Sequence, residues 1–185
     1  MFIELLTAIG IGTAALPSDA SEPTPILDMP DPTEVMCLAE NMYHEAKNQG
    51  TAGWSAVASV TFNRIRDNRF PDTVCEVVKQ GPTRESWKTR LLDLPDDERV
   101  YYPIRHRCQF SWYCDGKSDD IPSFDGKLFE IMYDYAELYL RPDIILIDIT
   151  DGATHYHADY VFPEWRKSKT KTVEIGDHIF YRWEK

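Results

Sequence analysis

The chain has 185 residues, of which 43% are hydrophobic and 28% charged, a composition that excludes collagen-like, coiled-coil and wholly disordered proteins. Its 31 acidic and 20 basic residues give a formal net charge of −11, and no basic run is present. This balance argues against a nucleic-acid partner, because binding to a phosphate backbone needs clustered Lys and Arg.

The chain begins with a stretch that lacks charge. Residues 5–18 contain no charged side chain, which is short for a membrane span of roughly 17–25 apolar residues but typical of an export signal. Ser18 and Ala20 supply small residues for a signal peptidase, whereas Glu4 departs from the usual basic start. We interpret residues 1–20 as an export signal or a membrane tether in transient contact with a membrane; a buried or frayed N-terminal helix is the alternative.

Prolines and acidic residues dominate residues 21–32, which predicts an extended linker. One folded domain is expected over residues 33–185. Its first helix has clear start signals, because Asp31 can cap it, Pro32 occupies the first helical position and Glu34 completes a capping box. Apolar residues then recur at helical spacing, and the helix is expected to end near Asn48.

The remainder of the domain combines further helices with short strands. The pattern predicts helices over 53–66, over 73–80 with Asp72 as its cap, and from Ser123 or Asp125 to the residue before Pro142, and strands over 153–157, 171–175 and 178–182. The last two strands are expected to form a hairpin around Gly176. Residues 82–122 show no clear period and indicate a long loop with one helix around 85–92. The predicted fold class is α+β, mainly helical with a small antiparallel sheet near the C-terminus.

Glu45 has an unusual position on the first helix. At 100° per residue it falls beside Leu38 and Met42, at the edge of the apolar stripe, whereas Glu40 is expected to face solvent. Glu45 also lies in the last turn, where the helix dipole disfavours a carboxylate. Burial and dipole both raise the pKa of a carboxyl group, which favours a general acid. An ordinary edge glutamate paired with Lys47 or an arginine is the alternative.

The chain has four cysteines, Cys37, Cys75, Cys108 and Cys114. An even number suits two disulfides in an exported protein, and three pairings are open. Cys108 and Cys114 flank a five-residue loop that they could close locally, which would leave Cys37 with Cys75. No C-x-x-C spacing occurs, so zinc ribbons and thioredoxin-type redox motifs have no support.

Five ordered motifs resemble one known family. They read CLAENMYHEAKNQG (37–50), AVASVTFNRIRDNRFPDTVCEVV (56–78), RCQFSWYCDG (107–116), ATHYHADYVFPEW (153–165) and IGDHIFYR (175–182). Over residues 36–182 the chain is similar to the SleB-type cell wall hydrolases, which include spore-cortex-lytic and endolysin-like enzymes. The resemblance implies a lysozyme-like fold, no cofactor, and cleavage of peptidoglycan between N-acetylmuramic acid and N-acetylglucosamine. The catalytic glutamate of the family, in an N-x-x-x-E-A stretch, falls on Glu45.

The chain departs from the family just after this glutamate. Where members often carry further glutamates in E-A-R-G-E, this sequence has Lys47, Asn48, Gln49 and later Ala52. Because a two-carboxylate glycosidase needs its second acid within roughly 5–9.5 Å, the departure favours a single-acid mechanism. The expected product is a 1,6-anhydromuramyl sugar, as in lytic transglycosylation, and simple hydrolysis remains an alternative.

Several other residues are candidates for contact with the glycan. The predicted substrate-binding residues are Asn63, Gln109, Ser111, Trp112, Tyr156 and His157. Amide, hydroxyl and aromatic groups are what a sugar cleft requires, and a disulfide would hold the loop around Trp112 rigid. The loop aromatics could instead pack inward, and Asn63 and Arg64 could be polar contacts of the core. Trp165 and Phe180 are expected in the core.

Two other classes of protein compete with this interpretation. His155 and His157 share one face of a strand and, with His178 or Asp159, could hold zinc in a wall peptidase, although no H-E-x-x-H motif accompanies them. A catalytically inactive glycan-binding protein would keep the aromatic cleft. The preferred interpretation is a monomeric, exported enzyme that acts on peptidoglycan glycan strands in the periplasm or cell wall, of phage or bacterial origin.

Overall fold

The computed structural model describes residues 29–184, so the predicted leader (1–20) and most of the predicted linker (21–32) lie outside the described residues. The helices are α1 (Pro32–Ala46), α2 (Gly50–Ile65), α3 (Val74–Val78), α4 (Trp87–Leu92) and α5 (Gly126–Leu140), and the strands are β1 (Thr83–Glu85), β2 (Tyr101–Pro103), β3 (His155–Ala158), β4 (Thr170–Ile175) and β5 (His178–Arg182). Short 3₁₀ turns cover Asp96–Glu98, Ser111–Cys114, Ser123–Asp125 and Glu164–Ser168. Within this part of the chain, no helix is long and apolar enough to cross a membrane.

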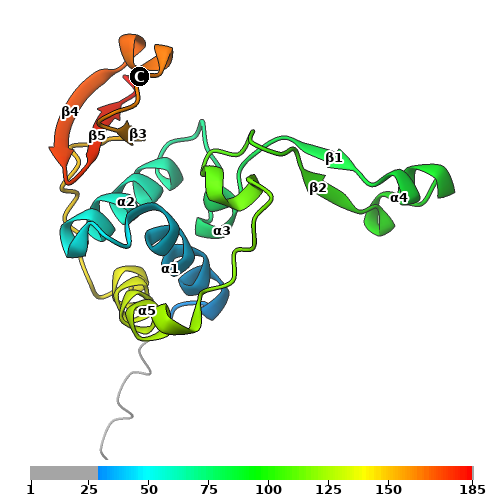
Figure 1. Cartoon of the computed structure of the whole chain (residues 1–185), viewed down its shortest axis with the longest axis horizontal. Helices are drawn as coiled ribbons and strands as arrows, with labels where there is room; N and C mark the ends of the chain where they lie inside the picture. Colours follow the sequence, from blue (N-terminus) through cyan, green and yellow to red (C-terminus); the bar gives the residue numbers. More distant parts are fainter. Residues whose placement is uncertain (1–28, 185) are drawn as a thin grey trace, which may run out of the picture.

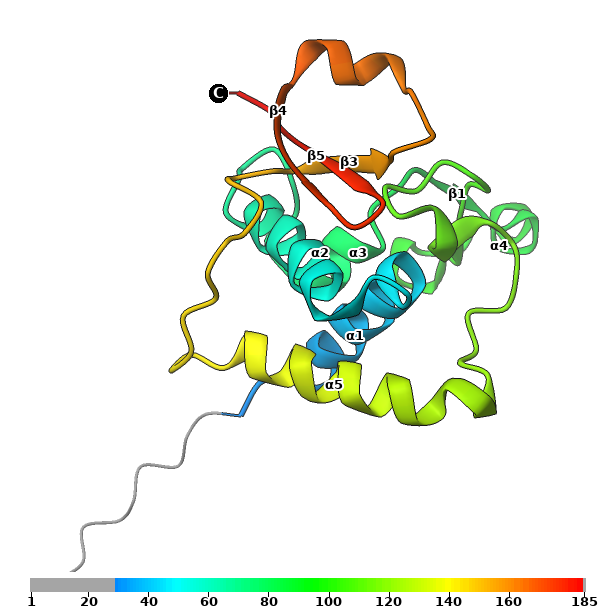
Figure 2. The same cartoon turned by 60° about the vertical axis from the view of Figure 1, so that its left-hand side comes forward.

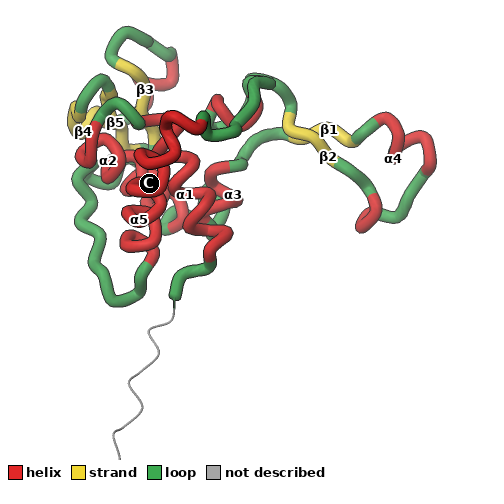
Figure 3. Tube along the Cα trace, turned by 60° about the horizontal axis from the view of Figure 1, so that its bottom comes forward, coloured by secondary structure: helices red, strands yellow, loops and turns green. Residues whose placement is uncertain are grey.

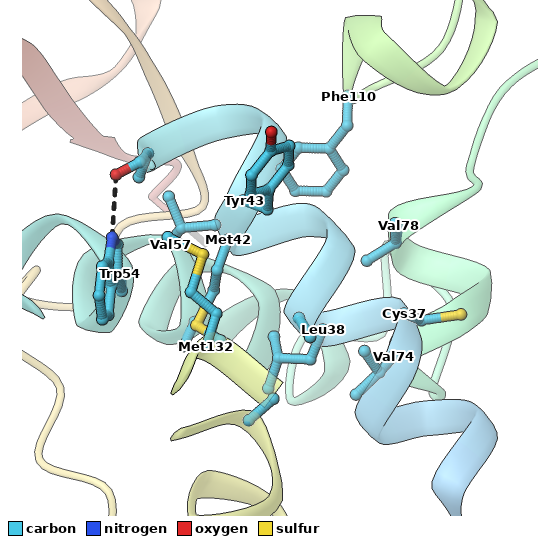
Figure 4. Close-up of a cluster of buried hydrophobic side chains, with 14 of the residues drawn as sticks. Cys37, Leu38, Met42, Tyr43, Trp54, Val57, Val74, Val78, Phe110 and Met132 are labelled. Carbon is cyan, nitrogen blue, oxygen red and sulfur yellow. Dashed lines mark hydrogen bonds between the residues drawn. The ribbon is translucent and has the colours of Figure 1, made fainter. Parts of the chain in front are cut away.

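Helix α1 is the centre of the helical part, because it packs against α2, α3 and α5 (Figures 1 and 2). Leu38 and Met42 on α1 are fully buried, and they meet Met132 of α5 and Val57 of α2 in one apolar cluster (Figure 4). The Trp54 indole joins this cluster and donates a hydrogen bond to the carbonyl oxygen of Ala46 at 3.0 Å, which ties α2 to the end of α1.

Helix α1 begins where predicted, but its capping differs from the expectation. The Asp31 carboxylate accepts a hydrogen bond from the Thr33 amide, as an N-cap should. Glu34 does not close a capping box; its Oε2 accepts hydrogen bonds from the Val74 and Cys75 amides at the start of α3. The cap of α3 is Thr73 rather than Asp72.

Residues 83–103 form an arm that projects from the body (Figures 1 and 3). Strands β1 and β2 pair antiparallel at its base, and α4 lies beyond them. The sequence predicted a helix here but otherwise only a loop, and the hairpin was missed because each strand has three residues, too few to show alternation.

The C-terminal sheet has the order β3–β5–β4, with all pairs antiparallel. It covers α2 on the side away from α5 (Figure 2), because the fully buried Phe180 packs on Ala56 and Val60 of α2. The hairpin of β4 and β5 turns at Gly176, whose φ of +57° suits glycine. Phe180 is in the core as predicted, whereas Trp165 is only half-buried. The α+β class is confirmed.

Both disulfides follow the pairing considered from the spacing. Cys37 is bonded to Cys75 and links α1 to α3, while Cys108 is bonded to Cys114 and closes the loop around Trp112. No cysteine is free among the described residues, which contain all four. One bridge therefore joins helices of the core, and the other constrains a surface loop.

Candidate active site

Glu45 lies in the last turn of α1, where the helix meets the C-terminal sheet. The Tyr156 hydroxyl on β3 donates a hydrogen bond to Glu45 Oε2 at 2.9 Å. Lys47, the alternative partner considered for this glutamate, instead binds Asp125 at 3.0 Å. Glu45 is half-buried, and its helical neighbours Met42 and Ala46 belong to the core. The carboxyl group is thus at the edge of the buried stripe, as its helical angle indicated.

The surroundings of Glu45 favour its protonated form. Burial has the largest effect and raises the pKa of the Glu45 carboxyl above its ordinary value, although the Tyr156 hydrogen bond and the nearby Arg64 charge lower it. The pKa of Tyr156 is raised well above its usual range by burial and by Glu45, so Tyr156 keeps its proton and remains a donor. A carboxyl group whose pKa is raised at the edge of a cleft is better suited to donate a proton than an ordinary surface glutamate.

Glu40 differs from its prediction, because it is half-buried rather than directed to solvent. Burial raises the pKa of Glu40 as well. Glu40 lines neither of the pockets that contain Glu45, however, so we assign it no role in this site.

Two pockets meet at Glu45. A cavity of about 380 Å³, here named the sheet-side pocket, is lined by Glu45, Arg64, Gln109, Phe110, Ser111, Tyr156, His157, Ala158, Tyr160 and His178. A second cavity of about 350 Å³, the loop-side pocket, is lined by His44, Glu45, Ser111, Trp112, Asp115, Lys117, Ser118 and Asp119. Both pockets include Glu45 and Ser111, so they adjoin at these two residues, and the pair is here called the Glu45 cleft. An extended chain molecule could pass Glu45 with units on either side.

Most of the predicted substrate-binding residues lie in this cleft. Gln109, Ser111, Tyr156 and His157 line the sheet-side pocket. The nitrogens of His157 already lie 2.8 Å from the Ala158 carbonyl oxygen and 3.1 Å from the Tyr181 hydroxyl, so its ring serves as a wall of the pocket.

Trp112 contributes to the cleft in a different way from that predicted. The side chain is 9% exposed, and its indole donates a hydrogen bond to Asn41 Oδ1 at 3.1 Å. One face stacks on the His44 ring, with centroids 4.4 Å apart. Trp112 is therefore a buried wall that positions His44, because its polar atom and one of its faces are already engaged.

Asn63 does not lie at Glu45. Its amide donates to Asp148 Oδ2 at 2.9 Å and to the Ala153 carbonyl oxygen at 3.1 Å, which fixes the loop before β3. It lines a separate cavity of about 480 Å³ that contains neither Glu45 nor Tyr156. Asn63 therefore makes polar contacts away from Glu45, since its direction on α2 differs by 100° from that of Arg64.

Arg64, His178 and His44 are among the cleft residues that were not assigned to the site from the sequence. Arg64 follows Asn63 and was weighed only as one of two equal possibilities. His44 directly precedes Glu45, and its pKa is lowered by burial. His178 comes from β5, and no local pattern connects it to α1. Only the pairing of β3 with β5 brings His178 to the site.

The zinc alternative has no supporting geometry. Among residues 29–184, no group of three or more His, Cys, Asp and Glu side chains could hold a metal ion. His155 and His157 do share one face of β3, as predicted. On that face both imidazole rings pack against the Trp165 ring. Burial lowers the pKa of His155 to about 3.

Comparison with known proteins identifies the family. Residues 48–181 match the family described as Cell Wall Hydrolase. The chain belongs to the cell wall hydrolases. Its fold is similar to the catalytic domain of the SleB protein of Bacillus cereus, with a TM-score of 0.50 and 20% identity over 88% of this chain and 99% of that one. The catalytic domain of the germination-specific lytic transglycosylase SleB from Bacillus anthracis is 19% identical, with a TM-score of 0.44 over 80% and 93% of the two chains. No curated protein matches the chain.

The matched range of this cell wall hydrolase includes Arg64, Tyr156 and the loop around Ser111, and it begins after Glu45. The polar residues that follow Glu45 have structural partners. Gln49 Nε2 donates to Asp177 Oδ2 at 2.8 Å, and its Oε1 accepts from the Asp177 amide at 2.9 Å. The Gln49 side chain thereby binds the turn between β4 and β5 and holds the sheet against the end of α1.

Proposed function

We propose that this cell wall hydrolase cleaves the glycosidic bond between N-acetylmuramic acid and N-acetylglucosamine in peptidoglycan, with Glu45 as its single proton-transferring residue. The observation that carries the proposal is a carboxyl group of raised pKa that lines two adjoining pockets. Glu45 is the only carboxylic acid lining the described sheet-side pocket. The two disulfides suit action outside the cytoplasm.

The proposed reaction uses Glu45 twice. The protonated carboxyl group donates its proton to the glycosidic oxygen, and the bond from this oxygen to C1 of the muramyl sugar breaks. The 6-hydroxyl of the same sugar then bonds to C1 and returns its proton to the Glu45 carboxylate. The product is a 1,6-anhydromuramyl end, and no water is consumed. Tyr156 contributes by holding Oε2, which leaves the other carboxyl oxygen to face the bond.

The decisive experiment compares Glu45→Gln with Glu40→Gln. Glutamine keeps the shape but cannot donate the proton, so clearing of purified cell walls should fall about 10²–10⁴-fold for Glu45→Gln, the range for loss of a general acid–base group. Glu40→Gln removes a half-buried carboxyl group from the same helix and should retain activity. Unchanged clearing by Glu45→Gln would refute the acid role, and no clearing by the unaltered protein would favour a glycan-binding protein.

Product analysis separates the two chemistries. Mass spectrometry of digested peptidoglycan should find anhydromuramyl ends, which are 18 mass units lighter than reducing ends because water is not added. Reducing ends alone would exclude the intramolecular step and establish hydrolysis.

The pH profile tests the role of Tyr156. Because the Tyr156 hydrogen bond lowers the pKa of Glu45, Tyr156→Phe should raise this pKa further. The limb of the pH–rate profile on which activity falls with loss of the proton should therefore move to higher pH. A profile that falls in height without moving would mean that Tyr156 does not influence the proton.

A further inference from the structure

The cleft contains buried polar atoms without partners. Within residues 29–184, seven buried side-chain nitrogen or oxygen atoms have no hydrogen-bond partner. Three of them belong to residues that line the Glu45 cleft: Arg64 Nη1 and His178 Nδ1 in the sheet-side pocket, and His44 Nε2 in the loop-side pocket. Buried polar groups are usually paired, so unpaired ones that gather in a cleft indicate a polar ligand.

Arg64 is held rigidly by its surroundings. The residue is 4% exposed, and its Nε donates a hydrogen bond to the Thr154 carbonyl oxygen at 2.8 Å. The guanidinium lies over the Phe110 ring at 4.8 Å and over the Phe70 ring at 5.4 Å. Burial lowers the pKa of Arg64 to about 10, so it stays charged at neutral pH. The guanidinium is therefore held in place by the protein, while its Nη1 is buried without a partner.

His178 supplies the opposite kind of group. Its ring lies edge-on to Tyr156, with centroids 5.1 Å apart. Burial lowers the pKa of His178, with smaller opposing effects from Asp177 and Asp159 and a further lowering from His157. A neutral imidazole has one N–H and one lone pair, so Nδ1 can accept a hydrogen bond when the proton is on Nε2. The lining of the sheet-side pocket thus includes one cationic donor, Arg64, and one imidazole that can accept, His178.

We propose that the sheet-side pocket is an acetamide subsite: the Arg64 guanidinium donates to the carbonyl oxygen of a 2-acetamido group, the His178 imidazole accepts from its N–H, and Phe110 covers its methyl group. This inference rests on the proposed function and specifies which part of the sugar the pocket binds. An acetamido group presents one acceptor, one donor and one methyl group, which are the complements of Arg64, His178 and Phe110. Both sugars of peptidoglycan carry such a group.

A carboxylate fits the same pocket less well. The lactyl group of a muramyl sugar that lacks its peptide could pair with Arg64, but it has no N–H for His178. A de-N-acetylated sugar fits worst, because its ammonium group would face the Arg64 guanidinium. The subsite therefore predicts discrimination against de-N-acetylated glycan.

Binding to Glu45→Gln tests the subsite without turnover. The probes are chitotetraose, which carries acetamido groups and no lactyl group, and its fully de-N-acetylated counterpart, titrated by calorimetry. We expect chitotetraose to bind at least about tenfold more tightly. Adding Arg64→Met or His178→Phe to Glu45→Gln should weaken chitotetraose about tenfold, the factor for one hydrogen bond, while affinity for the de-N-acetylated probe should not fall. His178→Phe keeps an aromatic ring against Tyr156 and provides the test if Arg64→Met does not fold.

The outcomes separate this inference from the proposed function. Equal affinity for the two probes, or no binding of chitotetraose, would overturn the subsite. A muramyl tetrasaccharide with free lactyl carboxylates is the third probe, and a loss in Arg64→Met that is confined to this probe would show that Arg64 binds the carboxylate instead. Retained lysis by Glu45→Gln would refute the acid role, whereas the binding contrast would still decide the subsite.

Discussion

The surroundings of the two ends of helix α1 differ in how completely their polar groups are paired. At the N-terminal end, residues 31–37, Asp31 caps the helix, Glu34 binds two amides of α3, and Cys37 is bonded to Cys75. At the C-terminal end, residues 43–46, Glu45 faces a cleft whose lining includes unpaired polar atoms of Arg64, His178 and His44. The first end is organised for stability and the second for binding, because a group already satisfied by the protein has little to offer a ligand.

The two disulfides provide the largest test of this contrast. Loss of the Cys37–Cys75 bridge, which closes 38 residues, should lower the free energy of unfolding by about 4 kcal/mol, and loss of Cys108–Cys114, which closes 6, by about 2 kcal/mol. Double substitutions to alanine and denaturant unfolding measure both. The order should reverse for specific activity of the folded protein, because only the second bridge constrains the loop that carries Ser111.

An equal loss of stability for the two pairs would mean that the loop bridge contributes to the core. If loss of the Cys37–Cys75 bridge lowered the activity per folded molecule more than loss of Cys108–Cys114, the assignment of stability to one end of α1 and binding to the other would be wrong.

Asn41 lies on α1 between these two ends and is fully buried. Its side chain accepts a hydrogen bond from the Trp112 indole and donates one to the Thr61 hydroxyl at 3.4 Å. Asn41→Ala should destabilise the protein by about 2 kcal/mol, because the Trp112 N–H would remain buried without an acceptor. Activity should fall as well, since Trp112 positions His44. Thr61→Val is the matched control, because it breaks the other hydrogen bond and leaves Trp112 paired; an equal loss of activity there would refute a specific role for the indole contact.

The same two ends show what the sequence could and could not predict. The cap at Asp31 and the helical spacing of the apolar residues are local, so they predicted α1 and the edge position of Glu45. Glu34 was misassigned because its partners, the amides of residues 74 and 75, come from 40 residues away. The sequence could not tell which of Asn63 and Arg64 reaches the cleft, because this depends on where β3 lies against α2. His178 enters the site through the pairing of β5 with β3, which no local pattern predicted.

Glu34 offers a smaller test at the N-terminal end. Glu34→Ala removes the acceptor of two amides of α3 and should cost about 1 kcal/mol of stability. Glu34→Gln keeps an acceptor oxygen without the charge and should cost less. Specific activity of the folded protein should be unchanged in both, as measured by clearing of cell walls. A clear loss of activity at normal stability would show that this end also shapes the cleft.

At the C-terminal end, the smallest effect concerns stability and pH. The pKa of Glu45 is raised in the folded protein above the ordinary value near 4.5, so the folded state holds the proton more tightly than the unfolded chain. Stability from this group is present below about pH 4.5 and is lost as the pH rises through the folded pKa. Glu45→Gln removes this loss, and its stability relative to the unaltered protein should rise with pH across that window. Thermal unfolding from pH 4 to 8 measures the difference. Parallel profiles for the two proteins would mean that the cleft does not hold the Glu45 proton, and the acid step would lose its physical basis.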